Sequence, residues 1–131
     1  GSCFFINKAM FEAVGLFDEN VFLYGEEDDI HYRLMHRFKD CKMIYDKSLR
    51  YLHLTKERKP DIKYEKTLID VAVIQNKKKG YSKQKTLINR QRCINLQIFR
   101  ERLRIMLGKK DQTLLDMLEK LKLYIKEKLE Q

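Results

Sequence analysis

Four consecutive acidic residues, Glu26, Glu27, Asp28 and Asp29, stand between a short apolar run and an amphipathic helical pattern. On a helix, Glu26 and Asp29 share one face, while Glu27 points elsewhere. Crowding carboxylates together costs energy, and such clusters are typical of sites that take up a proton or hold a cation. Acids in the first turn of a helix also stabilise it through the helix dipole, so a purely structural role competes with a chemical one.

A longer pattern surrounds these acids. Residues 11–19 are Phe-Glu-Ala-Val-Gly-Leu-Phe-Asp-Glu, residues 22–30 are Phe-Leu-Tyr-Gly-Glu-Glu-Asp-Asp-Ile, and Arg33 follows shortly after. In order, spacing and composition this stretch resembles the family 2 glycosyltransferases, which have the GT-A fold. The resemblance implies that residues 1–58 are the C-terminal part of such a catalytic domain, and that the chain is a segment of a longer enzyme.

The resemblance also implies roles for individual residues. In this family a carboxylate of the acidic motif is the general base that takes the proton of the acceptor hydroxyl. Glu27 stands at that position, with Glu26 as the close alternative. Phe17 and Asp18 resemble loop residues beside the acceptor pocket, while Asp29 either contacts the acceptor or orients the helix.

A histidine is the candidate metal ligand. Residues 49–53, Leu-Arg-Tyr-Leu-His, resemble the family's strand that ends in a histidine completing a divalent metal site, so His53 is implied to bind Mg²⁺ or Mn²⁺. A purely structural histidine at a strand end is the alternative. The Asp-x-Asp motif that holds the metal and the nucleotide diphosphate is absent from this sequence. We therefore expect the segment to be inactive on its own. The divalent metal site is expected to depend on the missing half as well as on His53.

The implied reaction has a nucleotide-sugar donor and a glycan or lipid-linked glycan acceptor, as in polysaccharide biosynthesis. The Gln-x-x-Arg-Trp signature of processive synthases is absent, and the chain has no tryptophan. The resemblance therefore favours an inverting, non-processive transferase. The alternative from a different class is a non-catalytic helical scaffold, or a membrane-surface or oligomerisation module, derived from a transferase.

The charge is distributed unevenly along the chain. Residues 1–58 contain 9 Lys/Arg and 10 Asp/Glu, whereas residues 59–131 contain 19 Lys/Arg and 9 Asp/Glu, a net charge of +10. A basic helical extension can pack on a neighbouring domain, form a homo-oligomer or lie against anionic lipid. Nucleic acid is not an expected partner, because acids are mixed with the bases at helical spacing and no aromatic platform is interleaved with them.

Three cysteines, Cys3, Cys41 and Cys93, form neither a CxxC pair nor a zinc-like spacing. We interpret them as buried thiols in a reducing compartment. No apolar run reaches the roughly 20 residues that a membrane span needs. The sequence therefore favours a cytoplasmic protein, with peripheral contact at the inner face of the cell membrane as an open question.

The hydrophobic patterning predicts two regions with different folds. Short apolar runs at 3–7, 21–24, 42–45 and 49–54 indicate strands, and helical patterns begin at Lys8 and near Glu26. These elements predict an α/β region at residues 1–58, which the resemblance implies is a partial GT-A domain. Residues 59–131 are predicted to be a basic, predominantly helical extension with helices at about 60–79, 83–107 and from 111 onward.

Overall fold

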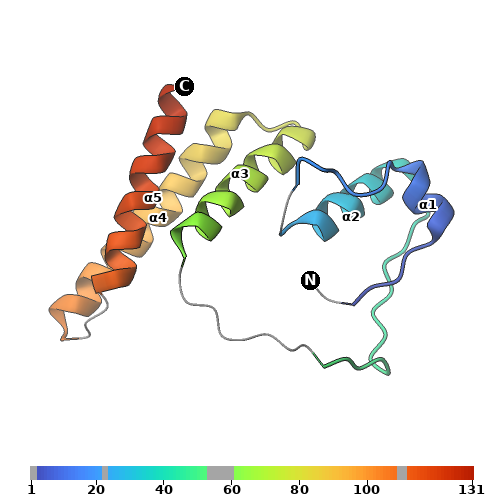
Figure 1. The fold of residues 1–131 in the computed structure, drawn as a ribbon, viewed down its shortest axis with the longest axis horizontal. Helices are drawn as coiled ribbons and strands as arrows, with labels where there is room; N and C mark the ends of the chain where they lie inside the picture. Colours follow the sequence, from blue (N-terminus) through green and yellow to red (C-terminus); the bar gives the residue numbers. More distant parts are fainter. Residues whose placement is uncertain (1–2, 22–23, 53–60, 109–111) are drawn as a thin grey trace. The chain divides into compact units, whose positions relative to one another are not determined.

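A computed structural model describes residues 3–21, 24–52, 61–108 and 112–131 of the chain. The chain divides into two compact units, Gly1–Glu57 and Arg58–Gln131 (Figure 1). The division falls one residue before the boundary that the change in charge and hydrophobic pattern suggested. Each unit has its own helices.

The second unit is built from three helices, α3 (Ile62–Lys78), α4 (Lys83–Met106) and α5 (Gln112–Glu130). Their bounds lie within a few residues of the helices predicted from the hydrophobic pattern. Consecutive helices run in opposite directions and pack side by side, as short connections require (Figure 1).

The ends of these helices are fixed by local chemistry. Asp61 and Ser82 are N-caps, and their side-chain oxygens accept hydrogen bonds from the amides of Lys63 (2.9 Å) and Lys85 (3.1 Å). α3 ends in a Schellman motif, in which Gly80 has a φ of 83° and the amide of Tyr81 donates to the carbonyl of residue 76 at 2.9 Å. Gly80 suits this position because it adopts a positive φ without strain.

Apolar side chains from all three helices form the core of this unit. The spacing of three and four residues between them places them on the inner face of each helix. Leu87 and Ile125 have no exposed surface at all. The buried cluster comprises Ile69, Leu87, Ile94, Ile98, Leu118, Leu121 and Ile125.

Polar side chains also join α3 to α5. The Tyr124 hydroxyl donates to both carboxylate oxygens of Asp70, at 2.9 and 2.7 Å, and the Lys128 ammonium lies 2.8 Å from the same carboxylate. The ammonium groups of Lys66 and Lys128 lie 4.6 and 5.0 Å from the centre of the Tyr124 ring. These cation–π contacts add to the ion pair between Lys128 and Asp70 at the edge of the core.

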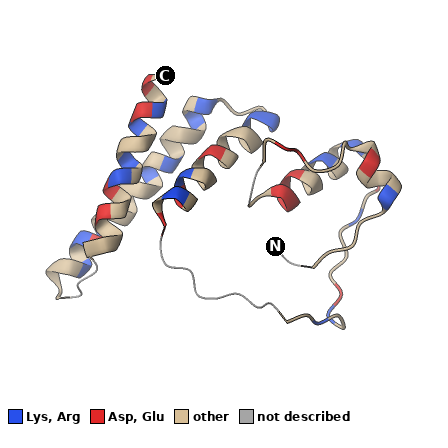
Figure 2. Ribbon diagram, in the orientation of Figure 1, with Lys and Arg blue, Asp and Glu red and all other residues tan. Residues whose placement is uncertain are grey.

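The first unit contains two helices, α1 (Lys8–Ala13) and α2 (Glu26–Arg37). The Asn7 side chain caps α1 by accepting a hydrogen bond from the amide of Met10 at 3.2 Å. α2 begins with the four acids, which are coloured red at its start in Figure 2. Few apolar side chains are buried in the described part of this unit, namely Val21, Ile30 and Leu34.

The predicted α/β fold is wrong for the residues that the structure describes, which form helices and no strand. The segments 3–7 and 42–45, expected as strands, carry no regular secondary structure, and neither does the described part of 49–54. The short run at 21–24 is described only at its two ends. A strand is stable only when its backbone groups pair with a neighbouring strand, and the described residues supply none.

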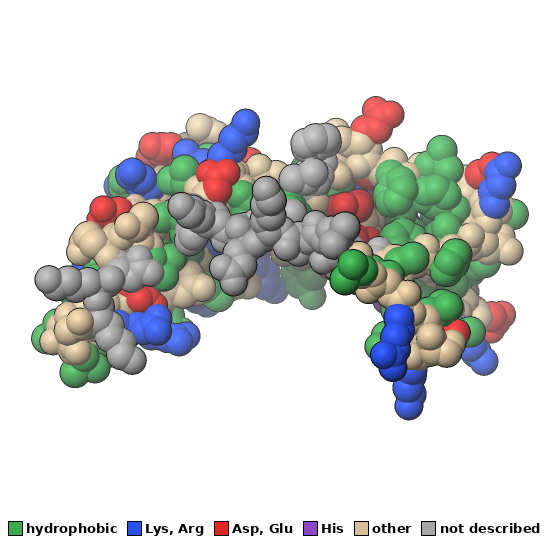
Figure 3. Space-filling model, turned by 60° about the horizontal axis from the view of Figure 1, so that its bottom comes forward, with side chains coloured by type: hydrophobic (Ala, Val, Ile, Leu, Met, Phe, Trp, Pro, Cys, Tyr) green, Lys and Arg blue, Asp and Glu red, His purple; other side chains and the backbone are tan. Residues whose placement is uncertain are grey.

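The apolar side chains of these segments are consequently exposed. Figure 3 shows hydrophobic side chains gathered on the surface of this unit. The exposed apolar side chains of this unit include Phe5, Met43, Ile44, Tyr45, Leu49 and Leu52. The segments are apolar as the sequence indicates, but the described residues do not bury them in a sheet.

Two further features concern the composition of the helices and the cysteines. No helix in the described part of the chain combines the length and apolar composition that crossing a membrane requires. The three cysteines are free thiols. Cys3 and Cys93 are exposed and Cys41 is partly exposed, so the expectation that all three thiols are buried is wrong.

Candidate functional site

The acidic motif forms the first turn of α2. Gly25, in the left-handed conformation with a φ of 107°, is the N-cap residue, and its carbonyl accepts the first helical hydrogen bond from the amide of Asp29 at 2.9 Å. Tyr24 before it also has a positive φ, 73°. Two consecutive residues with positive φ therefore precede the helix, which starts at Glu26, and all four acids lie near the positive end of the helix dipole.

Arg33 holds this turn against the preceding loop. Its Nε and Nη2 atoms lie 2.8 and 2.7 Å from the Asp29 carboxylate. The same guanidinium donates to the carbonyl of Val14, and to that of Leu16 at 2.6 Å. One side chain therefore joins α2 to the end of α1, which the planar five-donor guanidinium is suited to do.

The burial of this ion pair defines the role of Asp29 in the structure. Its side chain is only 2% exposed, and the Arg33 side chain is 21% exposed. A carboxylate so buried and so engaged positions the helix and the loop. Direct contact between Asp29 and an acceptor stays a prediction, and the helix-orienting role is the one that these contacts favour.

The other three acids of the turn differ from Asp29 in burial. Glu26 and Glu27 are half-buried and Asp28 is exposed. The Oε2 atom of Glu26 is buried and has no hydrogen-bond partner among the described residues. A buried carboxylate oxygen without a donor is costly, so this atom is suited to receive a proton or a donor from a ligand.

The loop between α1 and α2 carries Phe17 and Asp18, the residues predicted beside the acceptor. The Phe17 ring is half-exposed and packs edge-on against Phe11, with ring centroids 5.1 Å apart. The Asp18 carboxylate accepts hydrogen bonds from the amide and side chain of Asn20, at 2.8 and 2.9 Å. This Asx-type turn orders the loop that precedes α2.

The loop and the acidic turn are thus held together by Arg33. Leu16 has a φ of 61°, which is strained for a residue other than glycine, and its carbonyl is one of the Arg33 acceptors. The structure brings the loop of Phe17 and Asp18 and the turn of Glu26 and Glu27 into one Arg33-linked assembly. Sequence reasoning noted Arg33 as part of a motif but missed that it connects the two.

The predicted metal ligand, His53, lies outside the described residues. Among the residues that are described, no three His, Cys, Asp or Glu side chains gather in a way that could hold a metal ion. His31 and His36 are exposed on α2, and the His36 ring contacts that of Tyr32 at 5.7 Å between centroids. The described residues therefore provide no metal site to which chemistry can be assigned.

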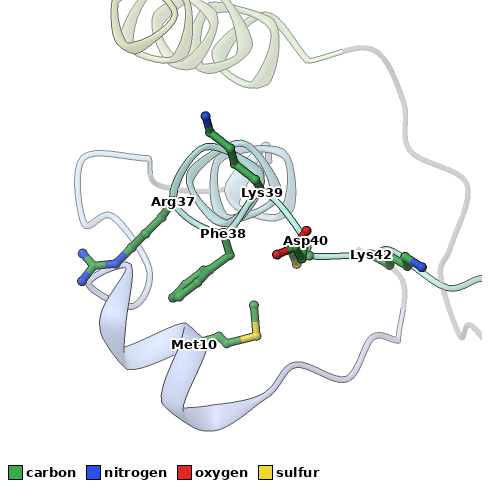
Figure 4. A pocket seen from close by; sticks show the side chains of 7 residues that line it. Met10, Arg37, Phe38, Lys39, Asp40 and Lys42 are labelled. Carbon is green, nitrogen blue, oxygen red and sulfur yellow. The ribbon is translucent and has the colours of Figure 1, made fainter.

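A hollow of about 560 Å³ lies at the other end of α2 (Figure 4). It is lined by Met10 and by residues 37–42, which include three basic side chains and one acid. At 1.5 Å per residue, the length of α2 places this hollow ~16 Å from the acidic turn. The hollow is open and far from the acids of residues 26–29, so it is separate from the candidate site.

Comparisons of the chain with protein families, with curated proteins and with solved structures give no match. The resemblance to glycosyltransferases therefore rests on the motif residues themselves.

Proposed function

We propose that this chain carries the catalytic-base and acceptor-side segment of an inverting, non-processive glycosyltransferase. The observation that supports the proposal is the Arg33-linked assembly, in which Asp29 is neutralised while Glu26 and Glu27 remain partly exposed in the same turn. A general base needs a carboxylate held rigidly next to the acceptor.

The proposed chemistry is a single displacement at the anomeric carbon of a nucleotide sugar. The Glu27 carboxylate accepts the proton of an acceptor hydroxyl while that oxygen forms a bond to the anomeric carbon. The bond from that carbon to the diphosphate breaks on the opposite face, and the nucleoside diphosphate leaves with the electron pair. Glu26 is the alternative base, because it lies in the same turn and has a buried oxygen without a partner among the described residues.

The chain's own residues then have distinct tasks. Phe17 offers a half-exposed ring against which a sugar can stack, and Asp18 lies beside it in the ordered loop. Arg33 and Asp29 keep the loop and the turn in register. A divalent metal, Mg²⁺ or Mn²⁺, would neutralise the leaving diphosphate, with His53 as the ligand that this chain contributes.

Donor binding is proposed to come from residues outside this chain's motif. The exposed apolar side chains of the first unit provide surface on which a donor-binding segment or subunit can dock. The acceptor is proposed to be a glycan or a lipid-linked glycan. With free thiols and a nucleotide-sugar donor, the cytoplasm is the proposed compartment.

The test uses the protein expressed from its complete reading frame. Release of nucleoside diphosphate is measured with UDP-, GDP- and dTDP-sugars, with and without glycan or lipid-linked glycan acceptors. Glu27→Gln is expected to lower kcat about 100-fold or more, because an amide cannot accept the proton. Binding of the nucleotide, measured by calorimetry, should not change.

Asp28→Asn is the matched control, because it removes an exposed carboxylate from the same turn. It should keep nearly full activity. If Glu26→Gln is the inactive variant and Glu27→Gln is active, the base is Glu26 and the proposed reaction stands. If both variants transfer sugar at the wild-type rate, the chain is a helical scaffold and the catalytic proposal is wrong.

A further inference from the structure

α4 has two apolar faces, of which the core uses one. Its inner face carries Leu87, Ile94 and Ile98, which are buried. A second series follows the helix at spacings of three and four residues on the opposite side. We name this series the outer stripe, and it consists of Ile88, Arg92, Leu96, Phe99, Leu103 and Met106.

The apolar part of the outer stripe is well exposed. Leu96 and Phe99 are 61% and 60% exposed, and Met106 is 82% exposed. From Leu96 to Met106 this surface extends ~15 Å along the helix, because an α-helix rises 1.5 Å per residue. An apolar surface of this length on one helix face exceeds the scattered exposed side chains that a folded domain normally shows.

The charge around the stripe is one-sided. α4 carries seven Lys and Arg residues and one acid, Glu101, which is buried and paired with Arg104 at 3.0 Å. Arg102 is paired with Glu119 of α5 at 2.7 Å. Arg92 and Arg100 are exposed and have no acidic partner among the described residues. Figure 2 shows how basic positions recur along this helix.

We propose that the outer stripe of α4 docks on an anionic lipid bilayer. The four apolar side chains from Leu96 to Met106 enter the boundary between headgroups and acyl chains. Arg92 and Arg100 remain at the headgroup level and bind lipid phosphates and carboxylates. A helix with apolar residues on one face and basic residues flanking it lies in the membrane plane in this way.

Charge complementarity favours lipid over a second copy of the chain. A symmetric contact between two outer stripes would place arginines against arginines, because α4 exposes no acid to pair with them. The whole region 59–131 has a net charge of +10, which adds to the repulsion between copies. A nucleic acid would satisfy the arginines but leave the leucines exposed, since Phe99 is the lone aromatic residue in the α4 sequence.

The first test is co-sedimentation of the 131-residue chain with vesicles. Phosphatidylcholine vesicles containing about one quarter phosphatidylserine are compared with pure phosphatidylcholine vesicles. The chain should sediment with the anionic vesicles, and added salt should weaken the binding. Equal binding to both compositions, or binding to neither, would overturn the proposal.

Matched variants locate the docking surface. Leu96→Asp on the stripe is compared with Leu123→Asp on α5, since Leu123 is exposed to nearly the same extent, 60%. Leu96→Asp is expected to lower vesicle partitioning about tenfold or more, because it removes an inserted apolar side chain and adds a repelled charge. Leu123→Asp should leave partitioning unchanged, and circular dichroism should show that both variants are folded.

A charge pair provides the second comparison. Arg92→Gln with Arg100→Gln should lower partitioning about 30-fold, because each basic residue at an anionic surface contributes about one factor of five. Lys120→Gln with Lys122→Gln, on α5, removes the same charge from exposed positions elsewhere. If both double variants lose binding equally, attraction is diffuse and the α4 surface is not the docking site.

A second copy of the chain or a nucleic acid on the outer stripe would each give a different result from lipid binding. If sedimentation velocity shows an oligomer that Leu96→Asp converts to a monomer, and vesicles do not bind, the stripe is a self-association surface and the lipid proposal is wrong. If a single-stranded RNA binds and Arg92→Gln with Arg100→Gln abolishes that binding while vesicles are ignored, the partner is nucleic acid. The lipid proposal does not depend on the glycosyltransferase assignment, since the assays measure no sugar transfer.

Discussion

The two units of the chain use their apolar residues differently. In the second unit, seven buried side chains from three helices form one cluster around Leu121 and Ile125. In the described part of the first unit, Val21, Ile30 and Leu34 are the buried apolar residues, while side chains such as Phe5 and Ile44 are 84% exposed. A helical hairpin satisfies its own backbone and buries its apolar face locally, whereas an extended apolar segment needs a partner surface.

Order in the first unit therefore depends more on polar contacts. The described core of that unit is small, and the Arg33 guanidinium links Asp29, Val14 and Leu16 across it. In the second unit the polar contacts add to a core that is already closed. We therefore expect that substitutions in the apolar core have the largest effect on the stability of the second unit. In the first unit, loss of the ion pair between Arg33 and Asp29 should have the largest effect on order.

The largest expected effect is in the helical core. Leu121→Ala is expected to lower the free energy of unfolding of the second unit by about 2–5 kcal/mol, because Leu121 is 1% exposed and its removal leaves a cavity. Urea unfolding followed by circular dichroism measures this change. Leu49→Ala changes an exposed position of the first unit and should alter the free energy of unfolding by less than about 0.5 kcal/mol. Similar losses in the two variants would contradict the comparison.

The next effect concerns the clamp. Arg33→Gln is expected to cost about 2 kcal/mol of local stability, because it leaves the buried Asp29 carboxylate without its hydrogen-bond donor. Amide hydrogen exchange should rise at residues 14–16 and 29 and stay unchanged in α4 and α5. Arg33→Lys keeps the charge but lacks the planar fork, so it should restore part of the protection. Unchanged exchange in Arg33→Gln would show that the loop is ordered by other contacts.

A smaller effect comes from the polar cluster between α3 and α5. Partial burial and the hydrogen bond to Asp70 raise the pKa of Tyr124 above its ordinary value, and the hydrogen bond to Asp70 raises the pKa of Lys128. Groups whose pKa is raised by folding stabilise the fold fully below their unfolded pKa, and that contribution disappears as pH rises through the folded pKa. Asp70→Asn should therefore cost about 1 kcal/mol at pH 7.

The pH dependence distinguishes this cluster from the rest of the core. The difference between wild type and Asp70→Asn should stay constant up to about pH 10 and shrink at higher pH, where tyrosine and lysine lose their protons. Chemical unfolding at a series of pH values measures the difference directly. A difference that grows with rising pH would contradict the assigned direction of the two pKa changes.

An effect of similar size is predicted at the turn between α3 and α4. Gly80→Ala is expected to cost about 1 kcal/mol, because its φ of 83° is strained for alanine although the space around it is open. Thermal unfolding measures the change. Gly80→Asn should cost less, since asparagine tolerates the left-handed conformation. An equal cost for both would indicate that the turn rearranges.

The candidate site was partly visible in the sequence. The acids of residues 26–29 and their place at a helix start follow from local spacing, and the structure has α2 begin at Glu26. The link from Arg33 to the loop at residues 14–16 was not visible, because contacts across 17 or 19 positions depend on how the loop turns. The roles of Glu27 and His53 stay predictions.

The sequence by itself determined the helices, because their caps and apolar spacing act within a few residues. Asp61 and Ser82 mark two helix starts, Gly80 and Gly108 follow two helix ends, and the apolar series from Leu87 to Ile98 marks the core face of α4. Only the tertiary structure decided whether the apolar runs at 3–7 and 42–45 pair in a sheet, and within the described residues they are largely exposed and unpaired. Strand formation depends on a partner far away in the chain or outside it, and an apolar pattern cannot specify whether that partner is present.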